Sequence, residues 1–188
     1  MSEQKTDRRI RRTRRELENA LIRLLKEKNI QSISVKELCE EADVTRSTFY
    51  QHYSNPYDML TEIQNRIMDQ VQEIINTTTG GDSYGFFLHI FTLLAEDDVK
   101  PEILSFDNGN GSGYERIGYM INNNYLLRWG QTFTPAQKKQ YDYYRCYIVF
   151  GCIAMVENWV NNGKQESPEE MAHITFSVLP KERMYLKA

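Results

Sequence analysis

The sequence predicts an all-α protein with a small N-terminal domain and a larger helical C-terminal domain. Apolar residues recur with the three-and-four spacing of a buried helix face. Ser or Thr followed three residues later by Glu or Gln marks several helix starts. Residues 1–53 carry 12 Lys and Arg against 9 Asp and Glu, whereas residues 54–188 carry 11 against 17. We therefore expect domains at 1–54 and 55–188 with different partners.

Length and composition indicate a globular protein. The chain has 188 residues, of which 40% are hydrophobic and 12% aromatic, and this is enough for a core. The longest apolar run, residues 146–156, is far shorter than the ~20 residues of a membrane span, and the N-terminus lacks the apolar core of a signal peptide. The three cysteines form no CxxC pair. These features predict a cytoplasmic protein with no metal site, no cofactor and no membrane partner.

Two helices are expected before residue 42. The first should cover residues 8–28, with Asn29 suited to a left-handed C-cap position. Its apolar face comprises Leu17, Ala20, Leu21, Leu24 and Leu25. A second helix should begin at Ser34, because Ser34 can cap it and Glu37 can close a capping box. This helix should end near Glu41.

The sequence VTRSTFYQHY, residues 44–53, predicts a third short helix. Thr45 is a good N-cap, and Val44 and Phe49 occupy the two positions of a hydrophobic staple. The first turn then offers backbone N–H groups, hydroxyls and a guanidinium to anionic or base-edge acceptors; its residues are Arg46, Ser47 and Thr48. Tyr50 and His52 can donate to phosphate oxygens from the helix flank. Two short helices across a tight turn form a helix-turn-helix, a DNA-binding motif.

A basic arm precedes this motif. Seven Lys and Arg residues lie within residues 1–15 against only Glu3 and Asp7, which gives a local charge of +5. Such a run suits a phosphate backbone, although a solvated helix face would have the same composition. We expect phosphate contacts from Arg8, Arg9 and Arg12, and we add Ser34 to the predicted DNA-binding residues.

The rest of the chain predicts a helical second domain. Helices are expected over residues 56–76, around 87–94, over 101–106, around 114–125, from 135 to 161 and from 168 to 179. The sequence DNGNGSG, residues 107–113, lacks the Lys-Ser/Thr pair and the preceding strand of a phosphate-binding loop. We interpret it as a mobile loop.

Residues 146–156 are apolar all round, so burial is expected on every side of this helix segment. One face can contact its own domain, and the other requires a partner. We therefore predict a dimer interface at Tyr147, Gly151 and Ala154, joined by Met171 of the last helix. Gly151 and Ala154 would allow two helices to approach closely.

Eighteen of the 22 aromatic residues follow residue 83, and this supply suits an apolar ligand cavity. Ordinary core packing is the alternative explanation. The predicted pocket residues are Phe87, Phe91, Met120, Tyr125, Tyr144 and Met155, and the expected ligand is a small apolar or aromatic effector. His89 and His173 lack an evident paired nucleophile or metal-spaced ligands, so the sequence argues against an enzyme.

Residues 13–60 resemble the N-terminal DNA-binding domain of the TetR family of bacterial transcriptional regulators. The resemblance is carried by the order and spacing of Thr13, Ala20, Ser34-Val35, Ala42-x-Val44-Thr45, Phe49-Tyr50-x-His52-Tyr53 and Leu60. It implies that the helix from Thr45 to about His52 enters the major groove, with a phosphate role for His52. It also implies that the last two long helices pack against their copies in a second subunit.

Two positions depart from the family pattern. Asp43 stands where the family usually has Gly in the turn, and Asp tolerates a left-handed backbone at modest cost. Pro56 replaces the usual phosphate-binding Lys. Asn55 as N-cap and Asp58 at N3 still start a fourth helix, whose backbone N–H groups can keep part of that contact. The arm from Arg8 to Arg15 can compensate along phosphates or in an adjacent minor groove.

These features together predict a TetR-like transcriptional regulator, taken as a repressor. It would bind a palindromic operator in double-stranded DNA as a homodimer, and a small-molecule effector in residues 55–188 would control its DNA affinity. The alternative is a DNA-binding co-activator or architectural factor of the same fold that is controlled by a protein partner.

Overall fold

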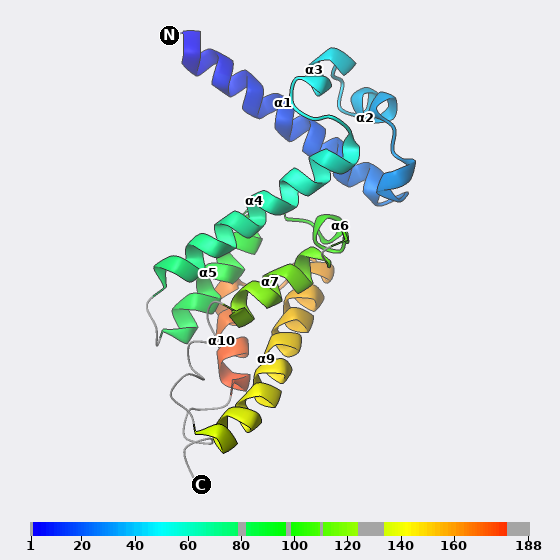
Figure 1. Ribbon diagram of the computed structural model, residues 1–188. Coiled ribbons are helices and arrows are strands. Elements are labelled where there is room, and N and C mark those ends of the chain that lie inside the picture. The colour runs from blue at the N-terminus through cyan, green and yellow to red at the C-terminus, as the bar shows by residue number, and fades with distance from the viewer. Residues whose placement is uncertain (1, 79–81, 97–98, 110, 124–133, 180–188) are drawn as a thin grey trace. The chain divides into compact units, whose positions relative to one another are not determined.

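The computed structural model describes residues 2–78, 82–96, 99–109, 111–123 and 134–179. Within these ranges every regular element is a helix, which confirms the predicted all-α class. The chain divides into two compact units, Met1–Asn65 and Arg66–Ala188, and the division falls inside one helix. Figure 1 shows the helices in chain order. No helix in the described ranges is long and apolar enough to cross a membrane.

The N-terminal unit contains three complete helices and the start of a fourth. These are α1 (Ser2–Leu25), α2 (Val35–Glu41), α3 (Arg46–Tyr50) and α4 (Pro56–Thr77), with a short 3₁₀ turn, η1 (Ile30–Ser32), between α1 and α2. Its core consists of fully buried side chains from all four α-helices: Leu17, Leu21, Leu38, Phe49, Met59 and Leu60. The basic arm is the first half of α1, because residues 2–15 contain good helix formers and neither Pro nor Gly.

Local caps start and separate the short helices. The Ser34 hydroxyl accepts a hydrogen bond from the Glu37 N–H at 3.2 Å, as predicted. The capping box is only half formed, however, because the Glu37 carboxylate pairs with the Lys28 ammonium. This hydrogen bond lowers the pKa of Glu37. Asp43 has a φ of 52°, which is the left-handed conformation expected for the turn between α2 and α3.

In its described part, the C-terminal unit contains the rest of α4 and five further helices. These are α5 (Ser83–Glu96), α6 (Pro101–Leu104), α7 (Gly113–Ile121), α9 (Pro135–Asn161) and α10 (Pro168–Val178). In Figure 1, α5 packs against α10, and α7 packs against α9. Phe91 of α5 meets Trp159 of α9 edge to face, with ring centroids 5.2 Å apart. The Trp159 indole donates to the Glu166 carbonyl at 3.0 Å. The core of this unit is therefore formed by helices distant in sequence.

The turn between α9 and α10 is fixed by several hydrogen bonds. Gly163, with a φ of 78°, donates to the Val160 carbonyl, and Lys164 donates to the Trp159 carbonyl, which closes the end of α9. The Lys164 ammonium also donates to the Leu94 carbonyl of α5 at 2.6 Å. The predicted capping box at the start of α10 is complete, with Ser167 and Glu170 bonding each other's backbone N–H.

The segment interpreted as a mobile loop instead makes defined contacts in its described part. The Asp107 carboxylate accepts hydrogen bonds from the Gly109 N–H at 2.7 Å and the Gly111 N–H at 3.0 Å. Ser112 and Glu115 then form a complete capping box that starts α7. Because the same residues cap a helix, their composition does not indicate a phosphate-binding loop.

Candidate DNA-binding surface and C-terminal cavity

Helix α3 directs its polar side chains outward from a buried anchor. The Thr45 hydroxyl accepts from the Thr48 N–H at 3.2 Å and lies 2.9 Å from the Thr48 hydroxyl. Phe49 is completely buried, whereas Tyr50 is 59% exposed. Arg46 and Ser47 are exposed, and Thr48 is partly exposed. The first turn of α3 therefore offers a guanidinium and hydroxyls to a ligand outside the unit.

Tyr53 and Arg14 hold this helix against its neighbours. The Tyr53 ring is 3% exposed and lies 5.8 Å, centroid to centroid, from the Phe49 ring. The Arg14 guanidinium lies 5.8 Å from the Tyr53 centroid and 3.4 Å from the Glu62 carboxylate. Arg14 therefore links α1, the end of the helix-turn-helix and α4. Arg14 lies three residues before buried Leu17, so the helical period could have separated it from the exposed Arg8, Arg9 and Arg12.

The basic arm and the turn of the helix-turn-helix line one open groove. Arg9 and Arg12 of α1 lie on one wall, and Asp43 lies on the other. The complete lining is Arg9, Arg12, Thr13, Glu16, Ala42, Asp43 and Val44. Arg8 is exposed on α1 but does not line this groove. The sequence had suggested the two arginines but neither Thr13 nor Glu16, because only the packing of α1 on the turn brings them together.

The two remaining predicted contacts occupy the ends of short helices. The Ser34 side chain is exposed at the start of α2, although its hydroxyl already accepts the Glu37 N–H. His52 is half-buried just after α3, with its ring 6.3 Å from that of Tyr53. Ser34 is thus exposed, whereas His52 is only partly accessible.

The start of α4 is already capped within the chain. The Asn55 side chain accepts from the Asp58 N–H at 2.8 Å, and the Asp58 carboxylate accepts from the Ser54 N–H at 3.0 Å. These two N–H groups are therefore not available to a phosphate, and Asp58 adds negative charge at the helix start. We had expected backbone N–H groups at the start of α4 to keep part of the phosphate contact that the family usually makes with a lysine at position 56. The caps leave fewer N–H groups for that contact.

Comparison with protein families settles the class of this chain. The model described as "Bacterial regulatory proteins, tetR family" matches residues 19–63. The model described as "Transcriptional regulator C-terminal region" matches residues 81–181, which is more than half of the chain. The chain belongs to the TetR family. As a TetR-family member it is a transcriptional regulator with a helix-turn-helix DNA-binding domain.

Individual relatives are distant. The uncharacterized HTH-type transcriptional regulator YxbF of Bacillus subtilis (strain 168) is 25% identical over 187 residues. The match covers 90% of this chain but only 45% of YxbF, so this TetR-family chain spans just under half the length of that relative.

Solved structures show the same fold. The dihydroxyacetone kinase operon activator DhaS superposes with a TM-score of 0.57 at 16% identity, covering 88% of this chain and 93% of DhaS. A TetR transcriptional regulator from Streptococcus agalactiae 2603V also gives 0.57, at 20% identity, covering 94% and 98%.

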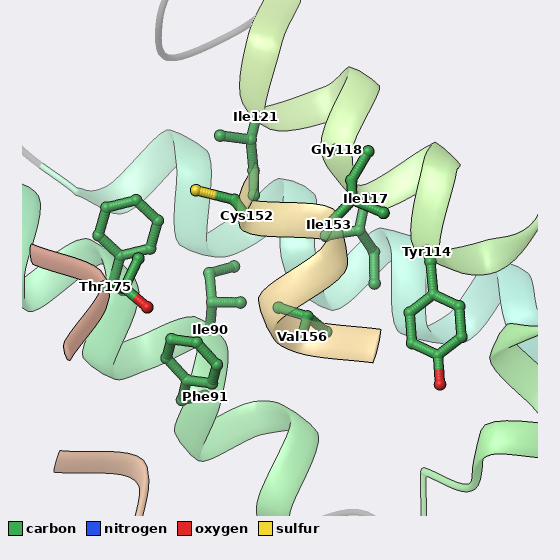
Figure 2. A pocket seen from close by; sticks show the side chains of 11 residues that line it. Ile90, Phe91, Tyr114, Ile117, Gly118, Ile121, Cys152, Ile153, Val156 and Thr175 are labelled. Carbon is green, nitrogen blue, oxygen red and sulfur yellow. The ribbon is translucent and has the colours of Figure 1, made fainter. Parts of the chain in front are cut away.

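The C-terminal unit of this TetR-family protein holds a small apolar cavity between α5, α7, α9 and α10 (Figure 2). Its volume is about 20 Å³, room for about one water molecule. The lining is Phe87, Ile90, Phe91, Tyr114, Ile117, Gly118, Ile121, Cys152, Ile153, Val156 and Thr175. Burial raises the pKa of the Cys152 thiol to about 12, so this thiol stays protonated. The described residues contain no group of three His, Cys, Asp or Glu that could hold a metal ion.

The predicted pocket residues are only partly those of this cavity. Phe87 and Phe91 line it. Met120, Tyr144 and Met155 are half-buried outside it, because the cavity-facing sides of α7 and α9 carry mainly aliphatic residues instead. Tyr125 lies outside the described residues. The prediction from aromatic content therefore missed the aliphatic wall, although the spacing of Ile117 and Ile121 marks an inward helix face.

One face of α9 is apolar and exposed. Tyr147 and Phe150 are 72% and 59% exposed, and Ala154 is also exposed. A Cβ atom on Gly151 would meet nothing within 4 Å among the described residues. In the single chain only the opposite face of residues 146–156 packs inward. Burial of the exposed face by a partner stays a prediction.

Met171 does not belong to an exposed face. Its side chain is 6% exposed, because α10 packs onto α5 through an inward row that also contains Ala172 and Thr175. The exposed large apolar residues of α10 are Ile174, Phe176 and Val178. The prediction of Met171 as an interface residue is therefore corrected, because its side chain packs within its own chain.

Proposed function

We propose that this TetR-family protein is a repressor that binds a palindromic operator as a homodimer in the cytoplasm. The observation that carries the proposal is the geometry of α3, where a buried Phe49 and a Thr45 cap support an exposed first turn. Arg46, Thr48 and Tyr50 then contact base edges or phosphates in the major groove. Ser47 contributes a further hydroxyl donor at the same turn.

The phosphate contacts come from the surroundings of α3. Arg8, Arg9 and Arg12 are exposed on α1. Ser34 caps the start of α2, and His52 lies just after the end of α3. Arginines positioned beside a reading helix supply affinity that depends on salt rather than on sequence. Glu16 and Asp43 share the groove with Arg9 and Arg12, so the two negative charges offset the two positive charges there.

The exposed face of α9 supports the homodimer. Tyr143, Tyr147, Phe150 and Ala154 recur at spacings of four, three and four, which places them on one side of the helix. A helix face with several large exposed apolar side chains generally marks an interface. Gly151 lies on the same side and leaves room for a close helix approach. A second copy would also supply the second α3 that a palindrome requires.

Selection of bound sequences from random double-stranded DNA tests the core of this proposal with the full chain. The expected product is an inverted repeat, bound by a species with twice the chain mass in light scattering. A selected site without a repeat, bound by a single chain, would refute homodimeric operator recognition. Transcription from a promoter that overlaps the selected site then distinguishes repression from activation.

Control by a small-molecule effector is part of the proposal, and the apolar cavity supports it. Control by a protein partner, as in a co-activator or architectural factor, is the second candidate. It is favoured by the small volume of the cavity, about 20 Å³. A metabolite screen for operator release supports the first candidate, whereas release only by a purified protein supports the second.

A further inference from the structure

We propose that the cavity between α5, α7, α9 and α10 is the closed form of a site for an uncharged, largely apolar small molecule. The molecule carries one hydroxyl or carbonyl oxygen, which forms a hydrogen bond with Thr175. This inference rests on the proposed effector control and specifies the chemistry of the effector. It is carried by three features: an unsatisfied hydroxyl, an uncharged wall and a movable side chain.

The hydroxyl of Thr175 is the polar group of the site. Thr175 is 1% exposed and lines the cavity, and its Oγ1 has no hydrogen-bond partner among the described residues. Thr in a helix commonly bonds a backbone carbonyl three or four residues earlier, but this hydroxyl does not. In Figure 2 its oxygen lies beside the apolar side chains of Ile90 and Phe91. A buried hydroxyl that stays unsatisfied destabilises the protein, so a ligand oxygen there gains a bond at little desolvation cost.

The wall selects an uncharged ligand. The residues that line the cavity include no Lys, Arg, His, Asp or Glu. A carboxylate or an ammonium group would therefore lose its hydration without gaining an opposite charge. The Cys152 thiol does not change this, because burial raises its pKa to about 12 and keeps it neutral and weakly nucleophilic. The ligand therefore binds reversibly, without a covalent bond, and carries no charge.

Water is a poor occupant of the same space. A buried water molecule needs two to four polar partners, and Thr175 offers one. Tyr114 contributes its ring to the wall, and Figure 2 shows its hydroxyl on the side of the cavity far from Thr175. An apolar ligand with one oxygen matches these partners, since it needs a single hydrogen bond.

The side chain of Ile153 can enlarge the cavity. A Cβ atom on Gly118 would lie 2.3 Å from Ile153 Cδ1, so the isoleucine rests directly against the backbone of α7. Ile153 is only half-buried and belongs to the cavity wall. A change of its rotamer toward solvent would vacate the space over Gly118 and admit a ligand of several carbon atoms. The site therefore opens where α7 and α9 meet.

Four related probes test the ligand chemistry by calorimetry on the full chain without DNA: benzyl alcohol, toluene, benzoate and benzylammonium at pH 7. Benzyl alcohol should bind more tightly than the other three, about tenfold more tightly than toluene for one hydrogen bond. Thr175→Val should remove the difference in affinity between benzyl alcohol and toluene. The same substitution should raise the melting temperature of the free protein, because it removes an unsatisfied hydroxyl. Thr175→Ser should keep the preference for benzyl alcohol.

The matched control is Thr92→Val, at a half-buried position of α5 outside the cavity, which should leave all four affinities unchanged. Three outcomes would each overturn the inference. Benzoate or benzylammonium could bind most tightly, benzyl alcohol could bind the wild type and Thr175→Val equally well, or no probe could bind at millimolar concentration. Operator affinity is measured separately. Thr175-dependent binding without operator release leaves the site assignment intact and refutes effector control. Operator release by a charged compound alone would support effector control and refute the assignment of this cavity as the effector site.

Discussion

At the scale of single residues, position on α3 and α1 determines what each side chain can contribute to DNA binding. Tyr50 is exposed beside the buried anchor Phe49, so its hydroxyl and ring can reach a base edge or a neighbouring phosphate. Arg9 and Arg12 lie along α1 at a spacing of three, on the groove beside the turn. We therefore expect Tyr50 to affect sequence preference, and Arg9 and Arg12 to affect electrostatic affinity.

Tyr50→Ala should weaken operator binding by about 1–3 kcal/mol and leave binding to unrelated DNA nearly unchanged. Arg9→Ala and Arg12→Ala should weaken binding to both DNAs, and each should reduce the slope of log K against log salt by about one. Fluorescence anisotropy over a salt series measures both effects. The assignment of α3 as the reading helix is wrong if the arginine variants alter sequence preference and Tyr50→Ala does not.

The contact between Lys28 and Glu37 predicts a pH dependence of stability. The hydrogen bond from the Lys28 ammonium lowers the pKa of Glu37 below its ordinary value of 4.5. A carboxyl group whose pKa is lower in the folded state stabilises the protein above its unfolded pKa, and this contribution disappears as the pH falls through the folded value. Glu37→Gln should therefore lower the free energy of unfolding at pH 7 and have a smaller effect below pH ~4.

Urea unfolding at the two pH values measures this difference. In a Lys28→Met background, Glu37→Gln should have little effect at either pH, because the partner of the carboxylate is absent. An equal effect of Glu37→Gln with and without Lys28 would show that the helix start, and not the ion pair, accounts for the contribution of Glu37.

At the scale of elements, α9 has two different faces. Ile148 and Val149 are each 5% exposed and pack inside the unit, whereas Tyr147 and Phe150 project outward. Gly151 lies among the outward residues, and the space around it is open in the described part of the chain. A larger side chain there has no intramolecular clash, so its effect on assembly can be separated from its effect on folding.

Gly151→Leu should abolish dimer formation and operator binding while leaving helix content unchanged. The leucine fits the isolated chain and favours the helix, but it would hold two α9 helices apart. Light scattering, circular dichroism and anisotropy measure the three properties. The control is Lys138→Leu, an exposed position on the first turn of α9 that is not in the apolar row. A folded Gly151→Leu dimer that binds operator normally would remove this face from the interface and leave the exposed apolar residues of α10.

At the scale of the whole molecule, the proposed homodimer would bring two copies of a very small reading element to the DNA. Helix α3 has five residues, so one copy contacts only a few base pairs. Two copies related by a twofold axis must meet their half-sites on the same side of the duplex. In the proposed homodimer, the assembled protein would therefore impose a fixed helical phase on the two half-sites of its operator.

Five base pairs inserted between the half-sites of the selected operator should reduce affinity to the level of unrelated DNA, because half a helical turn rotates one half-site to the opposite side. The insertion leaves both half-site sequences intact. Gel-shift titration of the native and extended sites measures the loss. Unchanged affinity for the extended site would mean that the two reading helices bind independently of one another.

The sequence alone determined the features that depend on neighbouring residues. A helix start needs a side chain and a backbone N–H three residues apart, so Thr45 and Ser167 could be identified as caps directly. The left-handed turn at Asp43 and the helix-turn-helix depend on the same short-range geometry. For this reason the class, the order of the described helices and the helix-turn-helix were all predictable.

Only the tertiary structure decided which side of each helix is buried and what lies against it. Periodicity gave the apolar faces but could not show that Met171 packs inward while Tyr147 remains exposed. The cavity joins Phe87 to Thr175, residues that are distant in sequence and meet only because α5 packs on α10. Glu37 likewise left its expected capping position for Lys28. Contacts of this kind depend on how helices pack in three dimensions, and the local pattern of side chains does not specify that packing.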